Sequence, residues 1–221
     1  VATLAAMSQL HFLMALVNQS SHDKLTGTSA GETIDGGKGV DFLDLTNEKA
    51  GWKVDLAAGK ADGGGDNVDT LKSIENVIGS DHADELMGDA GDNKLRGLKG
   101  NDVIYGRGGN DTIDGGQGLN QADYFDSPAG VSVNLAAGTA SDGYGTTDTL
   151  RNIQNVGGSE FADTLRGNGA ANTLLGRGGD DLLEGGNGTD ILDGGEGRDT
   201  VDMAAFGLRA VSISRSGADL V

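Results

Sequence analysis

The chain has 221 residues, of which 40 are glycine and only 4 % are aromatic, and its formal net charge is −18. Glycine is costly to order and the apolar residues are too few for a thick core, so composition alone indicates partial disorder. The acidity argues against nucleic acid as a partner, the absence of cysteine excludes disulfides and zinc–thiolate sites, and no apolar run reaches the roughly 18 residues of a membrane span.

The N-terminal residues 1–22 differ in composition from everything that follows. Apolar side chains such as Leu4, Met7 and Leu10 recur at partly helical spacing. We predict a short helix that caps the exposed first coil of the repeats, as repeat proteins require; the alternative is a remnant of a preceding domain. The chain begins at Val1 without an initiator methionine or a signal peptide of normal layout, so we expect a fragment of a longer protein.

A nine-residue pattern occupies most of the remaining chain. It occurs in a partial unit at 23–44 and in two blocks, 79–123 and 158–202, and each copy has a glycine first, an acid or amide sixth and usually an aliphatic residue eighth. The glycines permit a tight turn, and the three residues that follow the sixth position form a short strand with only the eighth pointing inward. We therefore predict that two nonapeptides form one coil, with repeat n stacked on repeat n+2.

The eighth positions form the predicted core. Ala122 is the one weak member. The others are Ile34, Leu43, Leu86, Leu95, Ile104, Ile113, Leu165, Leu174, Leu183, Leu192 and Val201.

The sixth-position acids would stack along the two edges of such a solenoid. Two carboxylates about 4 Å apart repel by roughly 1 kcal/mol in water and about 4 kcal/mol near a protein surface. Calcium relieves this repulsion, because it accepts six to eight oxygen ligands, including carboxylates and backbone carbonyls, in a flexible geometry. We expect the chain to be largely unfolded without calcium, since binding energy then becomes folding energy.

The nonapeptides lie inside a longer duplication. GWKVDLAAGKA at Gly51 matches GVSVNLAAGTA at Gly130, 79 residues further on. This offset divides the chain into full units at 45–123 and 124–202, each with a 34-residue connection (45–78 and 124–157), followed by the start of a truncated unit at 203–221. We predict that the connections add irregular coils to the same solenoid; the alternative is a loop, although structureless loops of this length are uncommon.

The connections also contain acids outside the nonapeptide register. These could bind further calcium, but we interpret them as surface charges. They are Asp62, Asp66, Asp69, Asp142 and Asp148.

The tandem GGxGxD nonapeptides resemble the calcium-binding RTX repeats of haemolysin-type proteins. The resemblance covers about residues 25–202 and implies an all-β fold, a parallel β-roll or right-handed β-solenoid stabilised by several calcium ions. It also implies secretion by a type I system of a Gram-negative bacterium.

In that family each calcium ion lies between repeats n and n+2, and the resemblance implies which residues bind it here. The strongest implied pairs of aspartates are Asp84 with Asp102, Asp163 with Asp181, and Asp181 with Asp199. Asp41, Asp111 and Asp190 have the right position but less certain partners, and pairs that contain Asn93, Asn120 or Asn172 should be weaker because an amide brings no charge. The implied turn ligands, chiefly through carbonyl oxygens, are Gly97, Lys99, Gly100, Gly115, Gln117, Gly176, Arg177, Gly178, Gly179, Gly194 and Glu196.

Three functions are compatible with these patterns. The first is a calcium-binding module that folds outside the cell and assists the secretion, folding or stability of a larger secreted protein. The second is a surface-adhesion, self-assembly or polysaccharide-binding module. The third is part of a secreted enzyme whose catalytic domain lies upstream; in this chain itself we expect no catalytic residues and no organic cofactor, because it lacks a nucleophile–base constellation. In each case we expect an extracellular or cell-surface location.

Overall fold

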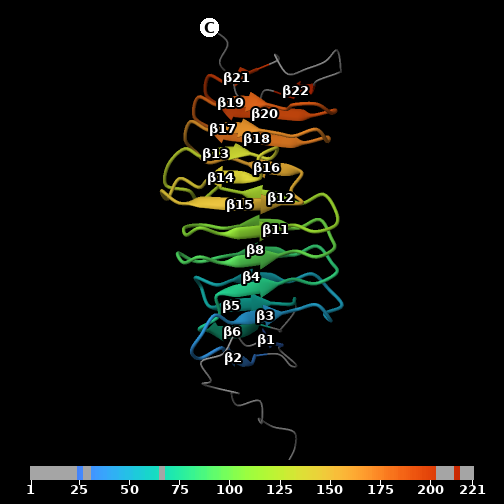
Figure 1. The fold of residues 1–221 in the computed structure, drawn as a ribbon, viewed down its shortest axis with the longest axis vertical. Helices are drawn as coiled ribbons and strands as arrows, with labels where there is room; N and C mark the ends of the chain where they lie inside the picture. The colour runs from blue at the N-terminus through green and yellow to red at the C-terminus, as the bar shows by residue number, and fades with distance from the viewer. Residues whose placement is uncertain (1–23, 27–30, 65–67, 203–211, 215–221) are drawn as a thin grey trace, which may run out of the picture.

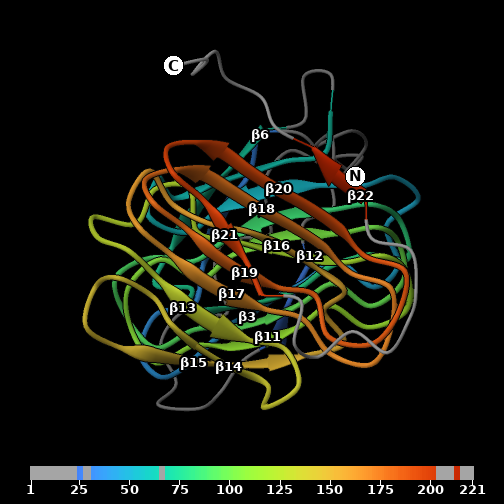
Figure 2. The ribbon, with the colours of Figure 1, turned by 90° about the horizontal axis from the view of Figure 1, so that it is seen from above.

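The computed structural model describes residues 24–26, 31–64, 68–202 and 212–214, and these segments are all-β. The strands stack along the long axis of the molecule (Figure 1), and the view along that axis shows successive coils superimposed (Figure 2). The predicted β-roll is confirmed. The helix predicted over 1–22 lies outside the described residues, as does most of 203–221.

The strands form two sheets of eleven strands each, named here the β1 sheet and the β2 sheet. In spatial order, the β1 sheet contains β1 (Lys24–Leu25), β3 (Phe42–Asp44), β7 (Asn76–Ile78), β9 (Lys94–Arg96), β11 (Thr112–Asp114), β15 (Thr147–Arg151), β14 (Thr139–Ser141), β13 (Ser132–Asn134), β17 (Thr164–Arg166), β19 (Leu182–Glu184) and β21 (Thr200–Val201). The β2 sheet contains β2 (Thr33–Asp35), β6 (Val68–Lys72), β5 (Lys60–Asp62), β4 (Lys53–Asp55), β8 (Glu85–Met87), β10 (Val103–Tyr105), β12 (Gln121–Asp123), β16 (Asn155–Gly157), β18 (Thr173–Gly178), β20 (Ile191–Glu196) and β22 (Ser212–Ser214).

The nonapeptide strands pair in parallel with the strand two repeats away, as the period predicts. Ile104 lies opposite Leu86 in the β2 sheet, and Leu165 lies opposite Leu183 in the β1 sheet. Because consecutive nonapeptides contribute to opposite sheets, each coil adds one rung to both. The turn that carries the sixth residue therefore falls at the edge of the stack, directly before each strand.

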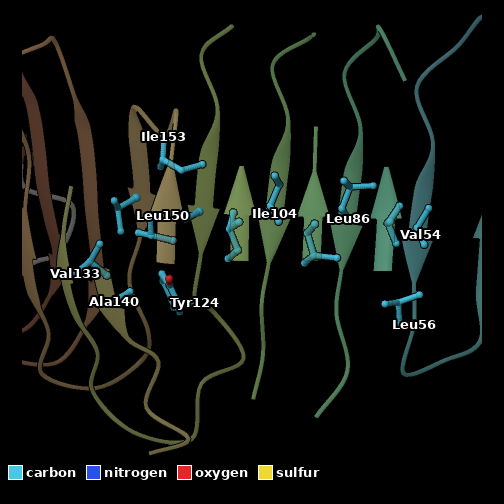
Figure 3. Close-up of a cluster of buried hydrophobic side chains, with 14 of the residues drawn as sticks. Val54, Leu56, Leu86, Ile104, Tyr124, Val133, Ala140, Leu150 and Ile153 are labelled. Atoms are coloured by element: carbon cyan, nitrogen blue, oxygen red, sulfur yellow. The ribbon is translucent and has the colours of Figure 1, made fainter. Parts of the chain in front are cut away.

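The eighth positions form the core. All of those predicted are buried apart from Val201, which is half-buried, and even the weak member Ala122 is fully buried. Trp52 and Leu135 of the connections pack against the same cluster. Figure 3 shows part of it, in which Tyr124 lies near Leu150, Val133 and Ala140.

The connections lie within the two sheets. In the first connection, β4 pairs antiparallel with β5, and β5 pairs antiparallel with β6, all in the β2 sheet. The second connection builds the same meander from β13, β14 and β15 in the β1 sheet. The sequence suggests irregular coils, whereas the structure shows three antiparallel strands that all add to one sheet.

The duplicated units consequently exchange sheets. β8 and β17 are equivalent strands of the two units, yet β8 lies in the β2 sheet and β17 in the β1 sheet. Along the chain, each nonapeptide moves to the opposite sheet, and each connection contributes a meander to one sheet and a single strand to the other. One unit therefore makes an odd number of steps between the sheets, so the next unit begins on the opposite sheet. The exchange keeps the sheets equal in height, because each receives one meander.

Two arginines bind across three successive coils of the β2 sheet. Arg107 reaches past Met87 to Asp55, with Nη1 to Oδ1 at 2.7 Å. Arg177 pairs in the same way with Asp123, which is only 3 % exposed, with Nη2 to Oδ2 at 2.7 Å. Arg107 thereby joins a nonapeptide turn to the connection strand β4, and Arg177 joins one to β12, the last strand of the preceding nonapeptide block.

Candidate metal centre

The sixth-position residues form a ladder of hydrogen bonds along the edges of the stack. In each rung the backbone N–H of one sixth residue donates to the side-chain Oδ1 of the sixth residue two repeats later. The rungs are Asp84 to Asp102 at 2.9 Å, Asn93 to Asp111 at 2.7 Å, Asp102 to Asn120 at 3.0 Å, Asp163 to Asp181 at 2.8 Å, Asn172 to Asp190 at 2.9 Å and Asp181 to Asp199 at 3.1 Å. The structure thus brings together every pair that the sequence proposes.

The second oxygen of several of these carboxylates is buried and has no hydrogen-bond partner. This holds for Oδ2 of Asp102, Asp111, Asp181 and Asp190. A buried, unpaired carboxylate oxygen is expensive unless a cation or a proton satisfies it. These four atoms mark where a metal ion fits the ladder.

The first glycine of each repeat leaves the space in front of that oxygen open. A Cβ atom on Gly97 would lie 2.1 Å from Asp102 Oδ2 and 2.8 Å from the carbonyl oxygen of Gly115. On Gly176 it would lie 2.1 Å from Asp181 Oδ2 and 2.5 Å from the carbonyl oxygen of Gly194. A carboxylate of repeat n and the first carbonyl of repeat n+2 therefore converge on one point, which matches the oxygen-only ligand set that calcium prefers.

The other turn residues that the resemblance implies as ligands take part in backbone pairing between successive coils. Arg177 and Gly178 pair with Gly195 and Glu196 across β18 and β20, and the carbonyl of Gly179 abuts Gly197. Lys99 forms an isolated parallel bridge with Gln117, whose carbonyl accepts a hydrogen bond from the N–H of Gly100 at 3.0 Å. Asp41 donates its N–H to Glu75 of the first connection at 2.8 Å.

The first aspartate of each block is already satisfied by a serine. Ser80 donates its N–H to Asp84 Oδ2 at 2.6 Å and its hydroxyl to Oδ1 at 2.9 Å. Ser159 binds Asp163 in the same way. These aspartates close the start of their blocks, so the interior aspartates have the greater need of a cation.

The asparagine rungs are partly satisfied as well. Oδ1 of Asn93 and of Asn172 each accepts a backbone N–H at 2.8 Å, from Asp89 and Asn168 respectively. Asn120 donates its side-chain amide to the carbonyl of Asn152 at 3.2 Å. These amide groups therefore already have hydrogen-bond partners within the chain, and the weaker binding expected at their pairs stays a prediction.

Residues of the connections also take sixth-position roles that the sequence analysis missed. Asp148 Oδ1 accepts the N–H of Asp111 at 3.1 Å, and Gln154 Oε1 accepts that of Asn120 at 2.9 Å. Asp69 continues the ladder in the first connection by accepting the N–H of Glu32 at 3.0 Å. The interpretation as surface charges is wrong for Asp69, which is 2 % exposed, and for Asp142 and Asp148, which are fully buried. Asp62 is half-buried, and Asp66 lies outside the described residues. The signal was present in the sequence: DTL at Asp148 repeats the sixth-to-eighth spacing of a nonapeptide.

Burial raises the pKa of the interior aspartates. The pKa of Asp102 rises to about 6, that of Asp181 to about 7 and that of Asp111 to about 8, with neighbouring carboxylates adding to the effect of desolvation. Without metal, the folded ladder therefore prefers protonated carboxyl groups.

This preference predicts how pH acts on the calcium-free chain. The folded pKa values of these aspartates exceed the ordinary value of 3.8. Their contribution to the stability of the metal-free fold is therefore fully present below about pH 4 and is lost as the pH rises through about 6 to 8. In excess chelator, the circular-dichroism signal of β-structure should increase when the pH falls from about 8 to about 5. An unchanged or decreasing signal over this range would contradict the proton-satisfied ladder.

No group of three or more acidic, histidine or cysteine side chains in the described segments gathers closely enough to hold a metal by itself. The candidate centres instead combine carboxylates from two repeats with backbone carbonyls.

No helix in the described part of the chain is long and apolar enough to cross a membrane.

Comparison with known families supports the same chemistry. The profile of the RTX calcium-binding nonapeptide repeat, which spans four copies, matches residues 20–45, 78–113, 87–122, 157–192 and 166–201. These matches cover just over half of the chain and leave out all but the end residues of the two connections. No curated protein matches the chain.

Proposed function

This chain belongs to the RTX calcium-binding nonapeptide-repeat family, and we propose that calcium binding outside the cell is what folds it. Repeats of this family bind calcium and occur as modules of secreted proteins, and they are typically not catalytic. The finer proposal is that the module stays open where calcium is scarce and becomes a rigid β-roll where calcium is abundant. In doing so it assists the export, folding or stability of a larger protein.

The buried, unpartnered carboxylate oxygens carry this proposal. Asp102, Asp181 and Asp190 are each at most 2 % exposed, and each leaves one oxygen without a hydrogen bond. Several such oxygens along one stack impose a penalty that a thin core of small coils is poorly able to offset. Calcium removes the penalty at every rung, so we expect folding to be cooperative with binding.

A calcium titration of this chain, followed by far-ultraviolet circular dichroism, tests the proposal. We expect a cooperative transition from coil to β-structure in the range of about 0.1 to 1 mM calcium, as for extracellular modules. Magnesium at the same concentrations should not replace calcium, because it demands stricter octahedral geometry and loses water reluctantly. A spectrum already rich in β-structure in chelator at neutral pH would show that the roll stands on packing alone.

A further inference from the structure

The nonapeptide block 79–123 meets the connection 124–157 through two hydrogen-bonded pairs, or rungs, of contrasting chemistry. One pairs Asp111 with Asp148, and the other pairs Asn120 with Gln154. In both, the side chain comes from the connection, outside the residues that the family profile matches. In both rungs the backbone N–H of the nonapeptide residue is the donor, but the rungs differ in charge.

The amide rung is complete without an ion. Asn120 donates its N–H to Gln154 Oε1 and its side-chain amide to the carbonyl of Asn152. The amide nitrogen of Asn120 faces the space beside Gly115, where it would lie 2.6 Å from a Cβ atom. The donor thus occupies the position at which other repeats present an unpaired carboxylate oxygen.

The acid rung is not complete. Asp111 is 1 % exposed, and its Oδ2 has no hydrogen-bond partner. A Cβ atom on Gly106 would lie 2.6 Å from this oxygen and 3.3 Å from Oδ2 of Asp148. Two carboxylates therefore face one gap, whereas at Gly97 and Gly176 the gap is shared by a carboxylate and a carbonyl.

The surroundings of this gap are negative, and their acidic side chains are held by hydrogen bonds. Asp142, which is fully buried, is held by the N–H groups of Tyr144 and Thr146, each at 3.0 Å. Tyr124 donates its hydroxyl to Asp148 Oδ2 at 3.2 Å. In the described part of the chain, no lysine or arginine forms an ion pair with Asp111, Asp142 or Asp148.

We propose that Asp111 and Asp148 bind a calcium ion at this junction, with Asp142 adding negative potential. The connection is then a part of the metal ladder and not a spacer between two separate ladders. Two carboxylate oxygens in one buried gap attract a hard divalent cation more strongly than a carboxylate and a carbonyl do. The proposed function supplies only the identity of the cation; the site itself follows from the unpaired oxygen and the facing carboxylate.

The first connection provides a natural comparison. Seventy-nine residues earlier, Leu45 stands in place of Tyr124 and Gly63 in place of Asp142. Asp69 keeps the rung, but the hydroxyl and the third carboxylate are missing. At these two aligned positions the first connection therefore has neither the hydroxyl nor the carboxylate that the second connection has.

The first test counts calcium ions bound per chain by equilibrium dialysis. The variant Asp148→Asn keeps an oxygen that can accept the Asp111 N–H and removes only the charge, so it should bind at least one ion fewer than the unchanged chain. Glu160→Gln, at an exposed position, makes the same change in net charge and should bind the full number. A folded Asp148→Asn chain that binds the full number would overturn the site.

A second test does not depend on the folding of that variant. Terbium replaces calcium and luminesces when a nearby tyrosine is excited, and the Tyr124 hydroxyl lies against the proposed ligand Asp148. Tyr124→Phe should lose a distinct part of the tyrosine-sensitised terbium emission. Unchanged emission would overturn the site. If the unchanged chain itself neither binds calcium nor folds with it, the proposed function fails, whereas failure confined to these variants concerns the junction alone.

Discussion

Replacing Gly176 by alanine should remove the ion between Asp181 and Asp199 and lower the free energy of unfolding in saturating calcium by about 4 kcal/mol. The added methyl carbon would lie 2.1 Å from Asp181 Oδ2 and 2.5 Å from the Gly194 carbonyl oxygen. Gly176 does not have a positive φ, so the backbone itself would accept alanine. The loss would therefore come from filling the space in which two proposed ligands converge.

The control for this substitution is Gly169→Ala. Gly169 is an exposed glycine in the turn of a neighbouring repeat, without a positive φ and with nothing within 4 Å of an added Cβ atom. Its replacement should change stability by less than about 0.5 kcal/mol. Denaturant unfolding in calcium and a count of bound ions measure both variants, and equal effects would mean that the glycines matter only for chain flexibility.

The nine-residue period was sufficient to predict the coil, the core and the aspartate pairs. Strand alternation allows only one of three strand residues to face inward, so Leu86, Leu95 and Leu192 could be assigned to the core from spacing alone. The partners Asp102 and Asp181 followed from the same period, because each coil consumes two repeats. Sequence spacing translates directly into position wherever every rung has equal length.

In the connections, sequence spacing no longer predicts which residues form a pair. Within a block the two members of a rung are 18 residues apart, but Asp111 and Asp148 are 37 apart because an antiparallel meander intervenes. Nothing in the period reveals how many residues the meander consumes. Asp148 was for this reason interpreted as a surface charge, although it is fully buried. Its neighbours Thr149 and Leu150 carry the missing information, since together they restore the sixth-to-eighth spacing of a nonapeptide.

Replacing Asp181 by asparagine should have opposite effects on stability with and without calcium. Asp181 is the middle of the one run of three sixth-position aspartates in the described nonapeptide blocks, Asp163, Asp181 and Asp199. Asparagine keeps the oxygen that accepts the Asp163 N–H, so the backbone rung survives and only the charge is lost. In calcium the free energy of unfolding should fall by about 3 kcal/mol, the typical cost of removing one partner of a buried charge pair.

In chelator near pH 6 the same variant should be at least as stable as the unchanged chain. Burial raises the pKa of Asp181 to about 7, so its ionised form destabilises the metal-free fold, and asparagine removes that charge. The control is Asp180→Asn at the adjacent exposed position, which alters net charge equally and should shift stability by less than about 0.5 kcal/mol in either condition. Thermal unfolding of the three chains, in calcium and in chelator near pH 6, distinguishes a metal ligand from a residue that only forms hydrogen bonds. A loss of equal size in both conditions would make Asp181 a hydrogen-bonding residue only, whereas a change of sign identifies its carboxylate as a ligand whose charge is tolerated because a cation neutralises it.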